Sequence, residues 1–306
     1  MSKAALGRFA PTPSGRIHLG NAFSYLLAWL GARKEDGAIL LRMEDLDTLR
    51  CSDDFAREIR EDLLWLGLDW DFETPPQRSR TEAYEQVLEL LRSRANVFPC
   101  WCTRGSLNLI SAPHASDGHP IHPASCRERS EEERKSMKGK PAYRLEAPDL
   151  TITFHDGVYS EYTENLRDAC GDFVLRRADG VFVYQLAVVV DDGEAGVTQI
   201  VRGCDLLSST PRQLYLYRLL GLEAPEYCHV PMLTDPEGRK LSKRDGDLEI
   251  RSLRHAMQPQ EILGRLAHAA GLIDRCEAIS ARELLSEFSW EKLRREDIIL
   301  APGAFT

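Results

Sequence analysis

The sequence predicts an α/β fold with a mainly parallel sheet, because strand and helix patterns alternate near the N-terminus. Residues 5–10, ALGRFA, have the pattern of a strand, and residues 38–44, AILLRME, that of a buried strand. Between them, apolar residues recur at helical spacing over 18–35: Leu19, Phe23, Leu26, Leu27 and Leu30. A strand, a loop, a helix and a second strand in this order form the first unit of a parallel, Rossmann-type sheet.

Further helix and strand patterns follow along the chain. Ser52, which precedes two aspartates, is typical of a helix start, because acids favour the positive end of the helix dipole. Helices are also expected over about 80–95 and from Ser208 or Ser209 to about 220. Strands are expected in YRLEA, LTITFHD, DFVLRR, FVYQLAVVVDD, TQIVRG and CHVPML. The helical tail is expected to bury one face, with Ile262, Leu266, Ala269 and Ala270.

Composition divides the chain into four segments. Residues 1–96 and 186–246 carry the predicted parallel strands and are expected to form the two halves of one Rossmann-type domain. Residues 97–185 are expected to be an inserted subdomain, because 97–140 are rich in Pro, His, Ser and Gly and then in charge. Residues 247–306 are expected to form a short helical extension.

Composition and charge exclude several classes of protein. The chain has 306 residues, of which 43% are apolar and 28% charged, as in ordinary globular proteins. No apolar run reaches the roughly 18–20 residues of a membrane span, and the first residues lack the pattern of a signal peptide. We therefore expect a cytoplasmic protein without a membrane partner. The net charge of −9 gives no support to nucleic-acid binding, which would need a local basic patch.

A turn-rich loop, PTPSGR, joins the first strand to the first helix, and such loops bind phosphates in open parallel sheets. The helix opens with His18, Leu19, Gly20 and Asn21. His18 and Asn21 could donate hydrogen bonds to phosphate oxygens, and Gly20 could let a flat adenine approach the backbone. The alternative is an ordinary capped helix after a proline turn, with His18 on the surface.

A second candidate phosphate loop, KLSKR, runs from Lys240 to Arg244 between the last predicted strand and the helical tail. Lys240 and Lys243 lie three residues apart between Gly238 and Gly246, so both could reach one polyphosphate. The alternative is a solvated basic loop. Because one such loop follows the first strand and the other the last, the two could close over one nucleotide, and the pair favours a nucleotide site.

These two segments resemble the signatures of the class I aminoacyl-tRNA synthetases. HLGN matches their HIGH signature and KLSKR their KMSKS signature. The words GRFAPTPSG, LRMEDLD, YQLAVVVDD and IVRGCDLLSSTPRQ are similar to the glutamyl branch, and the resemblance covers about residues 6–250. It implies a ligase that uses ATP and Mg²⁺ to convert L-glutamate to glutamyl-adenylate. Positioning and charge neutralisation, with no general base, would supply the catalysis.

The resemblance also implies roles for individual residues. Arg8 would pair with the side-chain carboxylate of glutamate, because a bidentate guanidinium selects an acid over an amide. Glu44 would receive the substrate ammonium, and Arg202 is a second possible carboxylate partner. The alternative is that Arg8 and Arg202 form internal salt bridges to Glu44 or Asp205. The implied glutamate-binding residues are Arg8, Phe9, Ala10, Pro11, Thr12, Glu44, Tyr184 and Arg202; the catalytic residues are His18, Asn21, Lys240 and Lys243; the ATP-binding residues are His18, Gly20, Asn21, Asp205, Lys240, Ser242 and Lys243.

Two positions depart from the usual glutamyl pattern. Thr12 stands where many relatives have Ser, which keeps the hydroxyl group. Val188 stands where full-length glutamyl enzymes usually have Asn, so that the polar contact expected there is lost.

Most of the eight cysteines are isolated and are expected to be buried thiols in a reducing cytosol, but three of them cluster with a histidine. A Cys-x-Cys pair followed by His-x-x-x-Cys offers four ligands for a tetrahedral zinc ion, which would hold a loop poor in apolar residues. The small glutamyl relatives have a Cys-x-Cys…Tyr-x-x-x-Cys zinc motif here. We expect one structural Zn²⁺ on Cys100, Cys102, His122 and Cys126, with His114 and His119 as alternatives to His122.

The acceptor of the glutamyl group is suggested by the length of the tail. About 60 residues follow KLSKR, too few for the anticodon-reading helical domain of full-length glutamyl-tRNA synthetases. This resembles their shortened paralogues, the glutamyl-Q tRNA(Asp) synthetases, which activate glutamate without tRNA and transfer it to queuosine in the anticodon of tRNA(Asp). We therefore expect a monomer that grips an anticodon stem-loop, since RNA is usually recognised in single-stranded loops. Candidate RNA contacts are Arg127, Arg129, Arg134, Lys135, Lys138 and Lys140, and the alternative is a solvated charged helix.

Three other functions remain open. A truncated glutamyl-tRNA synthetase would charge a tRNA 3′ end. A nucleotidylyltransferase with similar loops would not need the implied glutamate pocket. A non-catalytic paralogue that binds tRNA would not need intact His18, Gly20, Lys240 and Lys243.

Overall fold

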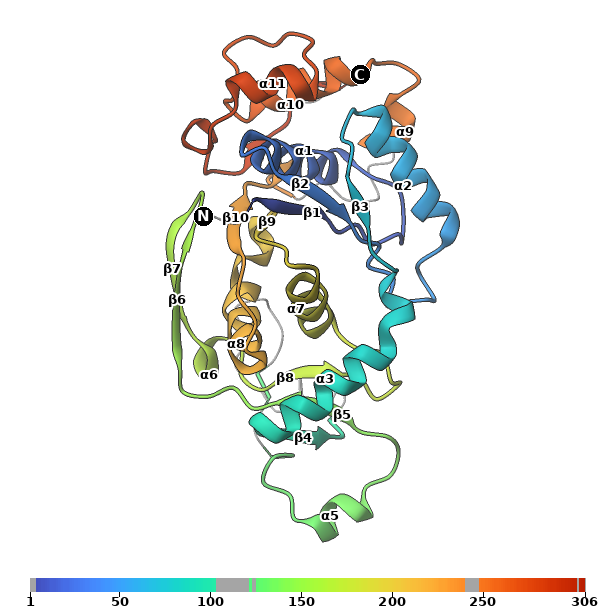
Figure 1. Ribbon diagram of the computed structural model, residues 1–306, viewed down its shortest axis with the longest axis vertical. Coiled ribbons are helices and arrows are strands. Elements are labelled where there is room, and N and C mark those ends of the chain that lie inside the picture. Colours follow the sequence, from blue (N-terminus) through green and yellow to red (C-terminus); the bar gives the residue numbers. More distant parts are fainter. Residues whose placement is uncertain (1–3, 103–120, 123–124, 240–247, 302, 306) are drawn as a thin grey trace.

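The computed structural model describes residues 4–102, 121–122, 125–239, 248–301 and 303–305. A central sheet lies between helices on its two faces (Figure 1). Helix α1 (Leu19–Lys34) covers one face, and helices α7 (Tyr184–Ala195) and α8 (Thr210–Leu220) lie on the other. The α/β fold expected from the sequence is therefore confirmed.

The sheet is mainly parallel. Strand β1 (Leu6–Phe9) pairs with β2 (Ala38–Leu41), which pairs with β3 (Phe72–Glu73). A second group has the order β9 (Gln199–Gly203), β10 (Glu226–Val230), β6 (Thr151–Asp156) and β7 (Ser160–Asn165), in which β7 is antiparallel. The two groups meet where the backbone N–H of Thr198 donates to Leu6 at 3.0 Å. The C-terminal ends of β1 and β9 therefore lie side by side, at the point where strand order reverses and ligands bind in open sheets.

Local sequence explains where several helices begin. Helix α2 (Asp53–Trp65) begins after Ser52, whose hydroxyl accepts the Phe55 N–H at 3.2 Å, as predicted. Helix α3 (Thr81–Arg94) follows a 3₁₀ turn, Gln77–Arg80. Helix α8 follows the 3₁₀ segment Cys204–Ser209. Its N-cap Ser209 makes no capping side-chain hydrogen bond, so the proline in the first turn contributes more to the helix start than expected.

One strand prediction is wrong. FVYQLAVVVDD, residues 182–192, was expected to be a strand, but all of it from Tyr184 onward lies in helix α7, and only Phe182 makes an isolated β-bridge. An apolar run of this length has no periodicity that separates a buried strand from a buried helix, and Gly196, with a φ of 72°, ends the helix in a left-handed cap. Val188 lies in the apolar core at 1% exposure, which explains how an apolar side chain is accommodated at that position.

One other strand prediction needs adjustment, and the strand β7 was missed. CHVPML is interrupted at Pro231, so that β10 ends at Val230 and a short strand β11 (Leu233–Thr234) follows. The polar strand β7 has no apolar alternation and was not predicted. It pairs with β6 at the edge of the sheet.

The segment 97–185 is divided between two sheets. Strands β4 (Val97–Cys100), β5 (Ala142–Leu145) and β8 (Phe173–Arg176) form a small antiparallel sheet, whereas the β6–β7 hairpin joins the central sheet. The short helices α5 (Glu131–Ser136) and α6 (Leu166–Ala169) connect these strands. The domain boundaries expected from composition stay a prediction, since part of the segment extends the central sheet.

The last described residues pack against the central domain. They form α9 (Ile250–Leu253), α10 (Pro259–Ala269), α11 (Ala281–Glu287), a 3₁₀ turn Trp290–Lys292 and β12 (Ile298–Ile299), which pairs with β11. Ile262, Leu266 and Ala270 are fully buried in a core shared with α1, and Ala269 is partly buried. None of the helices in the described ranges is long and apolar enough to cross a membrane.

Candidate active site

A cavity of about 340 Å³ lies at the C-terminal ends of β1 and β9, beside the start of α1. It brings together most of the predicted substrate and nucleotide residues that the structure describes. The lining residues are Arg8, Ala10, Thr12, His18, Gly20, Asn21, Ser24, Tyr25, Glu44, Tyr184, Val201, Arg202, Gly203, Asp205, Leu206, Met232 and Leu233.

Strand alternation divides the predicted run from Arg8 to Thr12. The alternate residues Arg8, Ala10 and Thr12 line the cavity, because successive side chains of an extended chain point to opposite sides. Phe9 is fully buried in the core and meets Tyr25 edge-on at 5.4 Å between ring centroids. Neither Phe9 nor Pro11 lines the cavity, so their side chains serve the fold.

Arg8 and Glu44 belong to a buried network of charges. Arg8 Nε donates to Asp192 Oδ2 at 3.3 Å. Arg42 donates to Asp192 Oδ1 at 2.6 Å and to Glu44 Oε1 at 3.0 Å. Burial raises the pKa of Glu44 above its ordinary 4.5, with Arg42 and Arg8 opposing the shift. Burial alone would also raise the pKa of Asp192, but the charges of Arg42 and Arg8 hold this pKa below the ordinary 3.8.

This network leaves polar atoms facing the cavity. Within the part of the chain that the structure describes, the terminal nitrogens of Arg8 and Oε2 of Glu44 make no hydrogen bond. The alternative expected an internal salt bridge from Arg8 to Glu44 or Asp205; among the described residues the salt bridge is made to Asp192 instead, and it uses only Nε. A guanidinium fork and a carboxylate oxygen remain available to a ligand.

Arg202 is also buried, but the groups that accept its hydrogen bonds are all neutral. It makes no ion pair with Glu44 or Asp205 among the described residues. Its charge is therefore not offset by a carboxylate in direct contact. The acceptors are His229 Nε2 at 3.0 Å, Tyr184 OH at 3.1 Å, Gln213 Oε1 at 2.8 Å, Thr210 Oγ1 at 2.7 Å and the Leu206 carbonyl at 3.4 Å.

The start of α1 forms another wall of the cavity. His18 is the N-cap, and its backbone N–H donates to Asn21 Oδ1 at 3.4 Å, which leaves the amide NH₂ of Asn21 for other partners. A Cβ at Gly20 would lie 3.1 Å from the His18 ring, so glycine gives this imidazole its space. Ser24 and Tyr25 also line the cavity and were not predicted. The helical spacing 18, 21, 25 was the signal that could have found Tyr25.

The far wall is largely apolar and was also missed. It includes Val201, Met232 and Leu233. Gly203 lies close to this wall: a Cβ here would lie 2.6 Å from Asp205 Oδ1 and 2.9 Å from Met232 Sδ, so either side chain would have to move. An apolar surface beside polar groups is typical of a small-molecule site.

The predicted lysine loop, with Lys240, Ser242, Lys243 and Arg244, lies outside the described residues. Both of its flanks reach the cavity wall. Leu233 of β11 lines the cavity on one side of the loop. On the other side, Glu249 forms a β-bridge with His18, and the Ile250 N–H donates to Ile17 at 2.9 Å.

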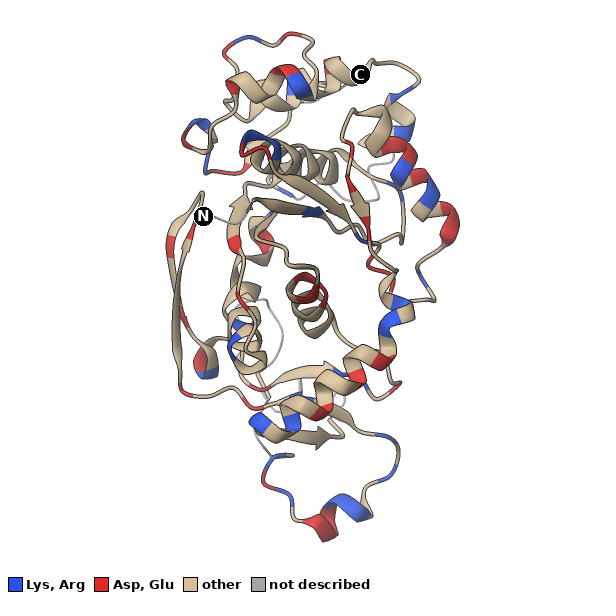
Figure 2. Cartoon of the chain, viewed as in Figure 1, with Lys and Arg blue, Asp and Glu red and all other residues tan. Residues whose placement is uncertain are grey.

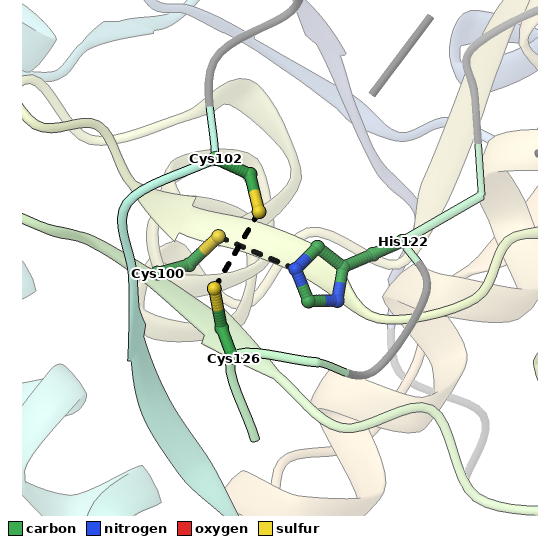
Figure 3. A group of neighbouring side chains, drawn as sticks. All are labelled: Cys100, Cys102, His122 and Cys126. Atoms are coloured by element: carbon green, nitrogen blue, oxygen red, sulfur yellow. Dashed lines mark hydrogen bonds between the residues drawn. The ribbon is translucent and has the colours of Figure 1, made fainter. Parts of the chain in front are cut away.

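A second site lies at the end of β4, where four side chains could hold a metal ion (Figure 3). Their ligand atoms all lie within 4.8 Å of one another. Cys100 Sγ is 3.4 Å from His122 Nε2, and Cys102 Sγ is 3.5 Å from Cys126 Sγ. Such spacings fit ligands about 2.0–2.3 Å from a central ion. Of the histidines considered, His122 joins the cluster, and His114 and His119 lie outside the described residues.

The surroundings of the cysteine cluster fit the same chemistry. His122 Nδ1 lies 3.5 Å from Asp172 Oδ2, the arrangement in which a carboxylate orients a metal-binding imidazole. Arg144 Nε donates to Cys100 Sγ at 3.4 Å. Although burial opposes it, hydrogen bonds from His122 and the charge of Arg144 lower the pKa of Cys100 to about 6, which favours the thiolate.

Comparisons with known proteins agree with this geometry. Residues 5–296 match the family described as tRNA synthetases class I (E and Q), catalytic domain. A Glutamyl-Q tRNA(Asp) synthetase of Nitratidesulfovibrio vulgaris is 50% identical over 281 residues, 87% of this chain and 86% of that protein. One of Symbiobacterium thermophilum is 44% identical over 308 residues, 95% of this chain and 94% of that protein.

Solved structures are similar as well. A glutamate tRNA ligase from Elizabethkingia meningosepticum, in complex with its amino acid, has a TM-score of 0.83 at 26% identity and covers 99% of this chain and 68% of its own. A glutamate-tRNA synthetase from Elizabethkingia anophelis has a TM-score of 0.85 at 26% identity, and the match covers 99% of this chain and 69% of that chain. The chain therefore belongs to the class I tRNA synthetases of the glutamate and glutamine group.

Proposed function

We propose that this enzyme uses ATP to convert L-glutamate to glutamyl-adenylate without tRNA, and then transfers the glutamyl group to queuosine in the anticodon of tRNA(Asp). The observation that carries the first step is the charge arrangement in the cavity. The unbonded terminal nitrogens of Arg8 and the positive charge of Arg202 can bind a substrate carboxylate, and Oε2 of Glu44 can bind an ammonium group. Glutamate has these groups.

The reaction needs little from the protein beyond positioning. Arg8 receives the side-chain carboxylate, with Arg202 as its second partner, while Glu44 receives the ammonium. The α-carboxylate then attacks the α-phosphate of ATP, bound with Mg²⁺, and pyrophosphate leaves. His18 and Asn21 at the start of α1 donate hydrogen bonds to the phosphates, assisted by Lys240 and Lys243 of the lysine loop.

The proposed acceptor rests on the relatives. The two described above are named Glutamyl-Q tRNA(Asp) synthetase, and the alignments cover most of each protein. Transfer to a base in an anticodon loop requires contacts to the RNA. Among the basic residues considered for this, Arg127 pairs with Glu146 at 2.5 Å and Arg134 donates to the Arg127 carbonyl, so both hold their own subdomain.

Arg129 is partly buried and donates to Met137 Sδ at 2.7 Å, whereas the three remaining candidates, all lysines, are more open to RNA. Lys135, Lys138 and Lys140 are exposed, and helix α5 carries acidic and basic residues together (Figure 2). These lysines are the ones we propose for contacts to the phosphate backbone.

The proposed zinc ion is structural, because its four ligands leave no open position for a substrate. Metal analysis of the purified protein is expected to find about one zinc per chain. His122→Ala is expected to lose zinc and to lower the melting temperature. The matched control is His155→Ala, an exposed histidine on β6. Full zinc content in His122→Ala would contradict this ligand set.

Two assays test the main proposal. Glutamate-dependent ATP–pyrophosphate exchange is expected without any tRNA, with glutamine as a poor substitute. Labelled glutamate is then expected to be transferred to tRNA(Asp) that contains queuosine and not to the same tRNA without it. Transfer to queuosine-free tRNA would favour a truncated enzyme that charges the 3′ end, and absence of exchange would favour a non-catalytic paralogue.

A further inference from the structure

Three buried polar side chains lie side by side across three adjacent strands, and only one of them reaches the cavity. Arg202 of β9 is the register partner of His229 on β10, and Asp156 ends β6 on the other side of β10. Arg202 Nε lies 3.0 Å from His229 Nε2, and His229 Nδ1 lies 2.6 Å from Asp156 Oδ2. None of the three is more than 5% exposed.

The chemistry of the donors defines the tautomer of His229. A guanidinium can only donate, so His229 Nε2 must be the unprotonated acceptor for Arg202. The imidazole proton is then on Nδ1, from which it is donated to Asp156. The Tyr227 ring stacks on the imidazole at 5.9 Å and 6° and also lies 5.0 Å from the Arg202 guanidinium carbon, which restricts both groups to one orientation.

Asp156 is held as an ionised acceptor. Its Oδ1 accepts the backbone N–H groups of Val158 at 3.0 Å and Tyr159 at 2.9 Å, and its Oδ2 accepts both the backbone N–H of His229 at 3.0 Å and the imidazole proton. With donors on both oxygens, the carboxylate is the form that the site accommodates.

We propose that Asp156 and His229 are positioning residues that hold Arg202 for the substrate carboxylate, and that they thereby set the preference for an acid over its amide. A carboxylate in direct contact would offset the charge of Arg202. A neutral imidazole fixes the direction of the guanidinium and leaves that charge for the ligand, while Asp156 supplies the negative charge one ring away. This inference rests on the proposed activation of glutamate.

Asp156→Asn tests the tautomer directly. The Oδ1 side is engaged by two loop N–H groups, so the new amide NH₂ is expected to face His229 Nδ1 and to move the imidazole proton to Nε2. That N–H would then oppose the N–H of Arg202. The KM for glutamate is expected to rise about tenfold or more, with the KM for ATP nearly unchanged. Nitrogen-15 NMR of the labelled histidines is expected to show Nδ1–H in the wild-type protein and Nε2–H in the variant.

A second set of variants covers the case in which Asp156→Asn does not fold. His229→Gln keeps an acceptor for Arg202 and is expected to recover most of the glutamate affinity lost in His229→Leu. Glu164→Gln changes a buried carboxylate on the same β6–β7 hairpin, bonded to the Tyr162 hydroxyl at 2.6 Å, and is the control for general effects on that hairpin.

The outcomes separate this inference from the proposed function. Equal rises in the KM for glutamate and for ATP, an Nε2–H tautomer in the wild-type protein, or equal KM values in His229→Gln and His229→Leu would each overturn the positioning role while exchange itself persists. If the wild-type protein performs no glutamate-dependent exchange, the proposed function is wrong, and the inference is overturned with it.

Discussion

The two arginines that line the cavity are both buried, but they are held in opposite ways. Arg8, from β1, pairs with the carboxylate of Asp192, which is itself shared with Arg42. Arg202, from β9, is held by neutral acceptors, and its nearest acid in that chain of bonds, Asp156, lies beyond an imidazole. The charge at Arg8 is therefore partly compensated within the protein by a shared carboxylate, whereas that at Arg202 has no carboxylate in direct contact and is left for a ligand.

This difference indicates what each arginine contributes together with the groups bonded to it, which we call the Arg8 end and the Arg202 end of the cavity. Buried ion pairs are costly to break from one side, because the remaining charge has no partner. The Arg8 end should therefore be important for stability as well as for binding. The Arg202 end should affect substrate affinity more than folding, since its neutral bonds can be exchanged without stranding a buried charge.

The largest expected effect is on stability at the Arg8 end. Asp192→Asn removes the carboxylate that Arg42 contacts at 2.6 Å and Arg8 at 3.3 Å. The free energy of unfolding is expected to fall by about 3–5 kcal/mol. Urea unfolding at pH 7 measures it.

The control for Asp192→Asn is Asp62→Asn. Asp62 is also fully buried, but its partner Arg254 is 28% exposed, so the loss should be smaller. The folded pKa of Asp192 is lowered, so its stabilisation is fully present above the unfolded value of about 3.9 and is lost as the pH falls through the lower folded value. The difference in the free energy of unfolding between the wild-type protein and Asp192→Asn should narrow in that acid range. An equal loss of unfolding free energy in Asp192→Asn and Asp62→Asn at pH 7 would contradict the comparison.

Sequence patterns predicted the Arg8 end only in part. The strand, the loop and the helix start at His18 follow from local periodicity and turn residues, so they could be located. The partner of Arg8 could not, because Asp192 lies 184 residues along the chain and on a segment whose apolar run resembles a strand. Tyr184, the first residue of helix α7, lines the cavity and was expected there only through the family resemblance. Most partners of Arg202 come from β10, α8 and α7, and no local sequence pattern links these elements to β9.

The cysteine cluster shows the opposite case. The structure brings its four predicted residues together as one group, because metal binding requires residue types at short spacings that remain visible in the sequence, and their role as zinc ligands stays a prediction. The side chains that contact these residues were not predicted: Asp172 lies beside His122 and Arg144 donates to Cys100, and both reach the cluster through the pairing of β5 with β8.

A smaller effect is expected when the Arg202 end is made to resemble the Arg8 end. Gln213→Glu places a carboxylate where Gln213 Oε1 now accepts from Arg202 at 2.8 Å. The KM for glutamate is expected to rise about tenfold, because the new acid offsets the charge that the substrate needs. The melting temperature should not fall. Steady-state exchange assays measure the KM, and Gln185→Glu, one hydrogen bond further from Arg202, is the matched control.

The smallest expected effect is the pH dependence of the KM for glutamate, which depends on Glu44. Burial raises the pKa of Glu44 above 4.5, and only its ionised form attracts the substrate ammonium. As the pH falls towards the raised value, the KM for glutamate is expected to increase, by about twofold when the pH equals that pKa. The substrate carboxyl titrates near 4.3, so the profile is compared with that of Glu44→Gln, which should have a higher KM but a flatter acid limb. Parallel profiles for the two proteins would show that the substrate alone titrates, and that Glu44 is not the group that meets the ammonium.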